Sequence, residues 1–440
     1  MTFSRRKFFA LAGTTAAGTL MASPLEALLA RKAFGQRIGR GYGPLLPDPN
    51  GLLELPEGFK YRILARTGDL MSDGNPVPGA HDGMGAFQGP GNTTIVVCNH
   101  ELSNNSGTQV QVPNRYDAIC RGGTTTLIVG PNRKLIKQFA SIGGTIRNCA
   151  GGETPWGSWI TCEEDVTIPS ASNGVTKLHG YNFEVPADAT EPVDPVPLID
   201  MGRFNHEAVA VDPATGYVYQ TEDRGDSLFY RFIPNVPGQL AEGGKLQAMV
   251  ILGKPFAVET YNRTTGASSG QFAVGQKWSV DWVDIPNPNP TTTDNVRVQG
   301  RNLGAARFAR GEGIWYGNGE FYFCATSGGP VSRGQVWRYI PGDETIDLFV
   351  ESQSINDLDM PDNICVAPTG DLILCEDGSG EQFLRGVSSN GELYNFGRNA
   401  LNTSELCGAC FSPDGRTMFV NIQSPGIIFA IWGPWNSKRG

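Results

Sequence analysis

Residues 205–223 read NHEAVAVDPATGYVYQTED, and this stretch decides the fold because versions of it recur along the chain in the same order. Each copy begins with polar or acidic residues, passes through an apolar segment and a tight turn, and returns through a second apolar segment to another polar or acidic cluster. The six copies are His81-Asp82 to Asn99-His100-Glu101, Asn148-Cys149 to Cys162-Glu163-Glu164, Asn205-His206-Glu207 to Glu222-Asp223, Arg310-Gly311-Glu312 to Thr326-Ser327, Asp362-Asn363 to Glu376-Asp377, and Cys410 to Asn421-Ile422-Gln423.

The turn inside each copy indicates an antiparallel hairpin. Residues 212–216, 317–319, 368–371 and 412–415 supply the Gly, Asn, Asp and Pro that tight hairpins require. A third apolar segment follows in several copies, at 228–234 and 336–341, which is the makeup of a propeller blade of about four strands. The repeat therefore predicts an all-β fold, a six-bladed β-propeller, with residues 36–440 as one domain.

The same geometry predicts where the acidic residues gather. In an antiparallel hairpin the start of the first strand and the end of the second lie at one edge, so the acidic clusters meet at one mouth of the central channel. Their members are Glu101, Glu163, Glu164, Glu207, Glu222, Asp223, Glu312, Asp362, Glu376 and Asp377. So many carboxylates around one axis repel one another unless cations neutralise them. For any single carboxylate, a blade-end turn or a solvated salt bridge is the alternative.

Composition agrees with a large, turn-rich β domain. The chain has 440 residues with Gly 57 and Pro 30, and 40% of its residues are hydrophobic. Length alone would suggest about three domains, but a propeller grows by adding blades around one axis. The net charge of −9 argues against a nucleic-acid-binding surface and suits cation binding.

The N-terminus resembles a bacterial twin-arginine export signal. Ser4-Arg5-Arg6-Lys7-Phe8-Phe9 precedes a modestly apolar run from Ala10 to about Ala22. A membrane anchor is the alternative, but the run is short for a span. We therefore expect residues 1–35 to be a leader read by the twin-arginine translocation machinery, and a periplasmic or secreted product without a stable membrane anchor, acting as a monomer.

The chain has nine cysteines, an odd number that leaves at least one unpaired in an oxidising compartment. Cys324 and Cys375 lie within apolar strands and are expected to be buried. The Cys407-Gly408-Ala409-Cys410 motif lacks the βαβ context of a thioredoxin-like site, although redox or metal chemistry there stays open. Cys149 differs, because it opens an innermost strand at the position filled elsewhere by acidic or polar residues.

A set of ordered motifs resembles the PhoX family of exported alkaline phosphatases. They are Asn148 to Gly152, Thr154 to Gly157, Thr161 to Glu164, Asn205 to Ala208, Glu222-Asp223, Arg310 to Gly313, Pro361 to Asn363 and Phe411 to Gly415. The resemblance runs from about Leu45 to the C-terminus. It implies a six-bladed propeller, a cluster of iron (Fe3+) and calcium ions at the channel mouth, and hydrolysis of phosphomonoesters. The segment 235–302, with its Pro/Asn/Thr-rich loop, is where substrate specificity could depart from the family.

Carried over motif by motif, the resemblance makes Cys149 an iron ligand, with Glu207 and Glu312 as carboxylate ligands. Cys149 is preferred to Cys162 because it lies on the inner strand. The resemblance also implies three calcium ligands, Asp362, Asn363 and Glu376. The acidic face adds three further predicted metal ligands, Glu101, Glu163 and Glu222.

The predicted catalytic residues are Arg310, as a clamp on the phosphate, and Glu312. Capping of neighbouring carboxylates is the alternative role of Arg310. Multivalent cations would neutralise the transition state and activate a water, which fits a chain with no P-loop. Two other function classes stay open, namely a lactonase- or phytase-like hydrolase using calcium alone and a non-catalytic binding propeller.

The two ends of the repeat predict how the ring closes. The strand-like segment 59–64 precedes the first copy, and the last copy ends with residues 427–432. An open sheet edge is avoided if the N-terminal segment supplies the outer strand of the final blade.

Overall fold

The computed structural model describes residues 41–266 and 270–436. The leader predicted over residues 1–35, and the predicted domain start at residue 36, lie outside these residues. Within the described ranges, no helix combines the length and the apolar character needed to cross a membrane.

Most of the regular structure consists of antiparallel strands in consecutive meanders of three or four. The first is β4 (His81–Gln88), β5 (Thr94–His100), β6 (Gly122–Val129) and β7 (Leu135–Thr145), and the second is β8 (Asn148–Glu153), β9 (Ser158–Glu163) and β10 (Asn182–Pro186). The next are β11 (His206–Val211), β12 (Val218–Glu222), β13 (Tyr230–Pro234) and β14 (Gly244–Ile251), then β16 (Gly311–Gly317), β17 (Glu320–Ala325), β18 (Gln335–Ile340) and β19 (Thr345–Glu351). The last are β20 (Pro361–Val366), β21 (Leu372–Glu376), β22 (Phe383–Val387) and β23 (Leu393–Asn399), then β24 (Leu406–Phe411), β25 (Met418–Ile422) and β26 (Ile427–Trp432).

Each predicted hairpin is confirmed as the antiparallel pair that begins a meander. The other strands extend or join the meanders. β2 (Leu53–Pro56) pairs with β23 and β1 (Leu45–Leu46) with β2, while β15 (Lys277–Asp284) joins β14 to β19. Helical structure in the described part is limited to α3 (Val296–Asn302) and the short 3-10 turns η1 (Pro90–Asn92), η2 (Ile199–Met201) and η3 (Leu240–Glu242).

The predicted closure of the ring is confirmed. β3 (Lys60–Arg66) pairs antiparallel with β26, from Lys60 opposite Trp432 to Arg66 opposite Ile427. The N-terminal segment thus covers the edge that β26 would otherwise expose, which removes a template for pairing with other chains.

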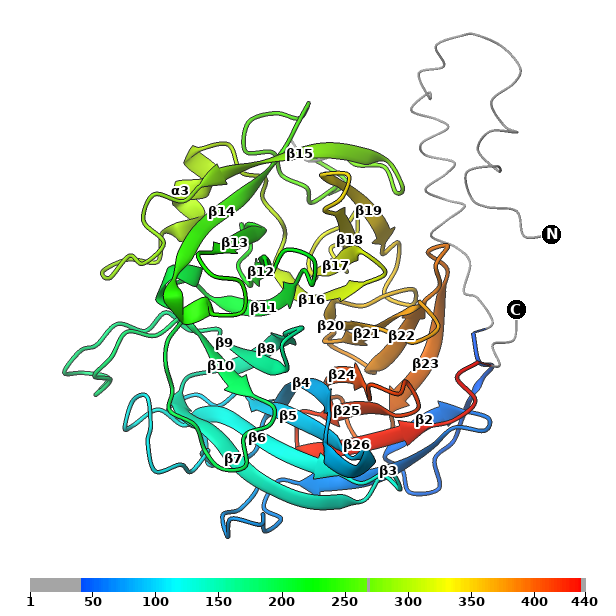
Figure 1. The fold of residues 1–440 in the computed structure, drawn as a ribbon. Coiled ribbons are helices and arrows are strands. Elements are labelled where there is room, and N and C mark those ends of the chain that lie inside the picture. Colours follow the sequence, from blue (N-terminus) through cyan, green and yellow to red (C-terminus); the bar gives the residue numbers. More distant parts are fainter. Residues whose placement is uncertain (1–40, 267–269, 437–440) are drawn as a thin grey trace.

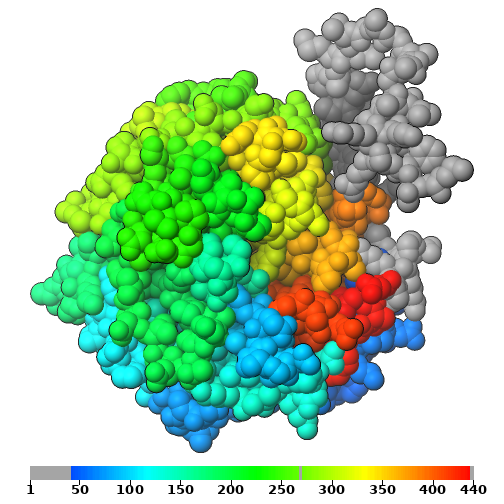
Figure 2. Space-filling model, in the orientation of Figure 1, coloured from blue at the N-terminus to red at the C-terminus, as the bar shows by residue number. Residues whose placement is uncertain are grey.

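The first strands of the meanders surround a common centre. β4, β8, β11, β16, β20 and β24 each contact the next in that order, and β24 contacts β4. Figure 1 shows these strands innermost, with the later strands of each meander farther out. In Figure 2 the segments follow one another around the face in chain order. The prediction of an all-β, propeller-like fold is confirmed.

The core lies between neighbouring sheets. Phe229, beside β13, stacks on Phe323 of β17 with ring centroids 4.4 Å apart, and Tyr219 of β12 lies 4.4 Å from Phe321. All of these rings are buried. The cysteines are buried and free, as the strand positions of Cys324 and Cys375 predict.

Candidate metal centre

Each first strand carries a β-bulge near its start. The paired residues on either side of the bulge are His81/Met84 in β4, Asn148/Gly151 in β8, His206/Val209 in β11, Gly311/Ile314 in β16, Pro361/Ile364 in β20 and Cys407/Cys410 in β24. A bulge leaves one residue out of the ladder and re-aims its side chain. The second residues of these strands are Asp82, Cys149, Glu207, Glu312, Asp362 and Cys407, and we call them the inner ring.

The residue after each inner-ring member is small everywhere except at Asn363, and the three that are glycines, Gly83, Gly313 and Gly408, lie against the next first strand. A Cβ on Gly313 would lie 2.7 Å from the carbonyl oxygen of Asp362. A Cβ on Gly408, where φ is +66°, would lie 2.4 Å from the carbonyl oxygen of Asp82. This close approach of the strands holds the inner ring together.

Two asparagine side chains donate hydrogen bonds to the backbone of the bulges. Asn99, next to last in β5, donates from Nδ2 to the carbonyl oxygens of Cys149 at 3.0 Å and Ala150 at 2.5 Å. Asn421, next to last in β25, donates in the same way to the carbonyl oxygen of Asp82 at 2.6 Å. Both asparagines are fully buried, so each fixes the backbone that carries an inner-ring side chain.

Two sets of donors converge where the inner ring meets the ends of the second strands. Cys149, Glu164 and Glu207, the first group, place their ligand atoms within 4.8 Å of one another, and so do Glu207, Glu312 and Asp362, the second group. Glu207 belongs to both groups. The structure thus brings together four of the predicted metal ligands, namely Cys149, Glu207, Glu312 and Asp362.

Burial and mutual repulsion disfavour the charged forms of these acids. Burial, and after it the charge of Asp377, raise the pKa of Asp362 to about 7, and burial raises the pKa of Glu164 to about 8 against the opposing effect of Arg147. The pKa values of Glu207 and Glu312 are raised in the same way, and burial raises that of the Cys149 thiol. A bound cation reverses this balance, because it favours the deprotonated ligands.

Arg310 closes one side of the second group. Its Nε and Nη2 donate to the two carboxylate oxygens of Asp223 at 2.8 and 2.9 Å, and Nη2 also lies 2.8 Å from Oε1 of Glu312. The predicted catalytic pair, Arg310 and Glu312, is therefore in contact. The alternative role of Arg310, capping the carboxylates of a neighbouring meander, is also present. Asp223, which Arg310 binds, belongs to the preceding meander.

The residues directly after four of the second strands form an outer ring, Glu101, Glu164, Asp223 and Asp377. Alternate residues of a strand point to opposite sides, so the residues just before them point into the meanders instead. Predicted ligands Glu222 and Glu376 lie at such positions. Glu222 accepts from the Tyr230 hydroxyl at 2.8 Å, and Glu376 accepts from Arg385 at 2.7 Å. Oε2 of Glu376 is buried without a hydrogen-bond partner among the described residues.

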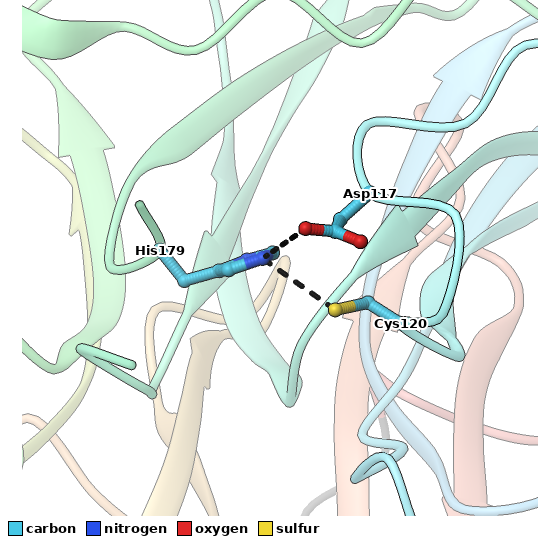
Figure 3. A group of neighbouring side chains, drawn as sticks. All are labelled: Asp117, Cys120 and His179. Atoms are coloured by element: carbon cyan, nitrogen blue, oxygen red, sulfur yellow. Dashed lines mark hydrogen bonds and ion pairs between the residues drawn. The ribbon is translucent and has the colours of Figure 1, made fainter. Parts of the chain in front are cut away.

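Glu163 also points into its meander, toward the buried group in Figure 3. Its Oε1 lies 2.6 Å from Nδ1 of His179, whose Nε2 lies 3.5 Å from Sγ of Cys120 and 3.9 Å from Oδ2 of Asp117. These last three residues also lie close enough to hold an ion. However, Oδ2 of Asp117 already accepts from Thr176, twice, and from Lys177, so hydrogen bonds account for the group.

The other two predicted ligands lie beside the two groups rather than in them. Glu101 contacts Arg147 at 2.6 Å and accepts from Gln423 at 2.9 Å. Asn363 lies one residue farther along β20 than Asp362 and lines a cavity of about 10 Å³, about the size of one water.

Sequence reasoning left five mouth carboxylates out of the predicted ligands, Asp82, Glu164, Asp223, Asp377 and Glu405. Asp82 occupies the same strand position as Cys149 and Glu207, so alignment of the copies by strand position could have found it. Its pKa is raised by burial and by Glu405. Glu405 directly precedes β24. The sixth copy was predicted to start at Cys410, five residues later, so Glu405 fell outside the repeat and was missed.

The raised carboxyl pKa values predict the pH dependence of the metal-free protein. Asp362 and Glu164 hold protons in the folded state up to about pH 7 and 8, whereas the ordinary values are 3.8 and 4.5. The folded state therefore binds more protons than the unfolded state between about pH 4 and 8, and its free energy of unfolding falls as pH rises through this window. We expect the melting temperature of chelator-treated protein to fall over this range.

Asp362→Asn should flatten that pH dependence, and the exposed-surface change Asp343→Asn should leave it intact. A slope that Asp362→Asn leaves unchanged would contradict the coupling of this carboxylate to its neighbours.

A family model described as alkaline phosphatase PhoX matches residues 40–426. Among solved structures, the chain is similar to Pseudomonas fluorescens PhoX in complex with vanadate, a transition state analogue, with a TM-score of 0.66 and 19% identity over 87% of this chain and 96% of that one. It is also similar to a gluconolactonase from Xanthomonas campestris, with a TM-score of 0.41 and 13% identity over 90% of this chain and 100% of that one. No curated protein sequence matches the chain.

Proposed function

Because the chain belongs to the PhoX family of alkaline phosphatases, and is therefore a phosphoric monoester hydrolase, we propose that its two donor groups at the channel mouth form the active site. One observation carries this proposal. Glu207 is shared by a group that contains a thiol and by a group made only of carboxylates, and Arg310 contacts the latter. A binding propeller has no need of such a set, and a hydrolase that uses calcium alone has no use for Cys149.

The donor chemistry fits two kinds of cation. A thiolate with carboxylates, as in Cys149, Glu164 and Glu207, suits iron, whereas the all-oxygen group of Glu207, Glu312 and Asp362 suits calcium. We propose these residues as the holders of iron and calcium, and the predicted ligand Glu376, which points into its meander, lies in neither group. When bound, such cations neutralise charge on the phosphoryl oxygens and lower the pKa of a water.

The protein residues then bind and orient the substrate. Arg310 is fixed by Asp223 and Glu312 through Nε and Nη2, so its Nη1 can donate to a phosphoryl oxygen without moving the guanidinium. For Arg310 to bind two phosphoryl oxygens at once, Asp223 would have to release the Nε and Nη2 edge of its guanidinium group. Below the inner ring, the small residues and the narrow cavity favour entry of the substrate from the mouth.

Two further parts of the proposal rest on other features. We propose six blades, supported by the six first strands whose contacts close a ring. We also propose export of the folded monomer by the twin-arginine route to the periplasm or medium, supported by the leader motif at residues 4–9. Folded export suits a site that must be loaded with metal before it crosses the membrane.

Chelation tests the metal dependence. We expect EGTA to abolish hydrolysis of p-nitrophenyl phosphate, and added calcium to restore it, because carboxylate-bound calcium exchanges readily. The visible colour of an iron thiolate should persist through the treatment. Metal analysis of the same samples is the control, since it shows whether calcium has left. Full activity in excess EGTA, with no calcium on the protein, would rule out a catalytic calcium.

A further inference from the structure

Arg147 has the same place in its meander as Arg310. Arg147 directly precedes β8 and Arg310 directly precedes β16, and both have a left-handed backbone, with φ of +47° and +58°. Each contacts an outer-ring carboxylate of the preceding meander. Nη2 of Arg147 lies 2.6 Å from Oε1 of Glu101, as the guanidinium of Arg310 binds Asp223. The two arginines are therefore counterparts in the repeat.

Each arginine also contacts one of the two donor groups. Arg147 pairs with Glu164 of the first group, and Arg310 lies 2.8 Å from Glu312 of the second. Since Glu207 belongs to both groups, the two guanidinium groups flank the cluster, with Glu207 between their partners.

The turn itself does not require an arginine. Ala80 and Met360 precede β4 and β20 with φ of +47° and +54°, so neither charge nor length is needed for this backbone. The side chain of Arg147 is 40% exposed, and both of its ion pairs run through Nη2. Its Nε is buried and has no hydrogen-bond partner among the described residues. The guanidinium thus keeps donors that its carboxylate partners do not use.

We propose that Arg147 is a second phosphate-binding arginine, which donates to a phosphoryl oxygen of the monoester beside the first donor group, as Arg310 does beside the second. This inference rests on the proposed function. A dianionic phosphoryl group bound over the two donor groups would meet a cationic donor beside each of them. A fixed guanidinium on each side would orient it for attack and bind product phosphate as well.

The alternative is that Arg147 only neutralises Glu101 and Glu164. The two roles differ in what the metal-loaded enzyme does with inorganic phosphate. Arg147→Ala, loaded to wild-type iron and calcium content, should bind inorganic phosphate about 10- to 100-fold more weakly as a competitive inhibitor, because one charged hydrogen bond is lost. KM for p-nitrophenyl phosphate should rise with it.

Arg147→Lys covers the case in which the alanine variant loses metal. Lysine keeps a charge beside Glu101 and Glu164 but lacks the guanidinium fork, so weakened phosphate inhibition is expected there too. Arg224→Ala is the matched control, since this arginine follows Asp223 and pairs with Asn205 and Asp294, outside both groups. It should leave phosphate inhibition unchanged.

The outcomes separate this inference from the proposed function. If the metal-loaded wild type fails to hydrolyse phosphomonoesters, the proposed function fails. If it is active and a metal-loaded Arg147 variant is inhibited by phosphate as the wild type is, only the role of Arg147 is overturned.

Discussion

Glu207→Gln is expected to lower phosphomonoester hydrolysis by about 1,000-fold, because the transition-state stabilisation that bound cations supply is worth several kcal/mol. Glu207 is the carboxylate common to the groups of Cys149 and of Asp362, so a single change weakens both. Glu164→Gln and Glu312→Gln each alter one group, and each should cost less than Glu207→Gln. The measurement is kcat/KM for p-nitrophenyl phosphate, with iron and calcium determined on the same preparation.

The same variant should make the metal-free protein more stable. Burial and the charges of Asp362 and Glu164 raise the pKa of Glu207 far above its ordinary value, so at neutral pH the metal-free fold must bind a proton there that the unfolded chain does not, and this lowers its free energy of unfolding. Glutamine is neutral without that proton. We therefore expect a higher melting temperature after chelation together with the loss of activity. A variant that lost activity and also unfolded more readily would point to a structural role for Glu207 instead.

The repeat made most of the architecture predictable, because each hairpin is local. The turns at residues 212–216 and 412–415 specify their own geometry, and the need to cover β26 predicts its pairing with β3. The bulges were not predicted. A bulge adds one residue to one strand, and the apolar pattern on either side of it stays the same.

That one residue explains which of the predicted ligands come together in the structure. Cys149, Glu207 and Asp362 stand second in their strands, where the motifs themselves are distinctive. In the doublets Glu163-Glu164 and Glu222-Asp223, both members are acidic. Because successive residues of a strand point to opposite sides, the position at which the strand ends decides which member faces the mouth. The sequence prediction chose the first member, whereas Glu164 is the member that joins the first group. Glu163 and Glu222 are engaged within their meanders by His179 and Tyr230.

The structure also bears on the choice between Cys149 and Cys162 as the iron ligand. Cys149 Sγ lies 3.3 Å from the carbonyl oxygen of His206 and belongs to the first group. Cys162 is buried in an apolar cluster with Ile160 and Leu198. The preference for the inner-strand cysteine over Cys162 as the iron ligand therefore has a geometric basis, and it remains to be tested with metal.

Cys149→Ser is expected to remove iron, its thiolate-to-iron absorption and most of the activity, a loss of about 100-fold or more, because a hydroxyl is a poor substitute for a soft thiolate. Iron content by metal analysis, the visible spectrum and kcat/KM measure it directly. Cys375→Ser should instead lower the free energy of unfolding by about 1 to 2 kcal/mol, because it places a hydroxyl in an apolar cluster.

Cys407→Ser is the most demanding control, since Cys407 holds the same strand position as Cys149. Its Sγ lies 3.1 Å from the carbonyl oxygen of His81, just as that of Cys149 approaches His206, but Cys407 belongs to neither donor group. If the neighbouring carboxylates, and not the position alone, make the iron ligand, then Cys407→Ser keeps its iron. Iron loss in Cys162→Ser, with Cys149→Ser unaffected, would make the choice of Cys149 wrong. Full activity in both would end the iron-thiolate proposal, because no other cysteine lies in either group among the described residues.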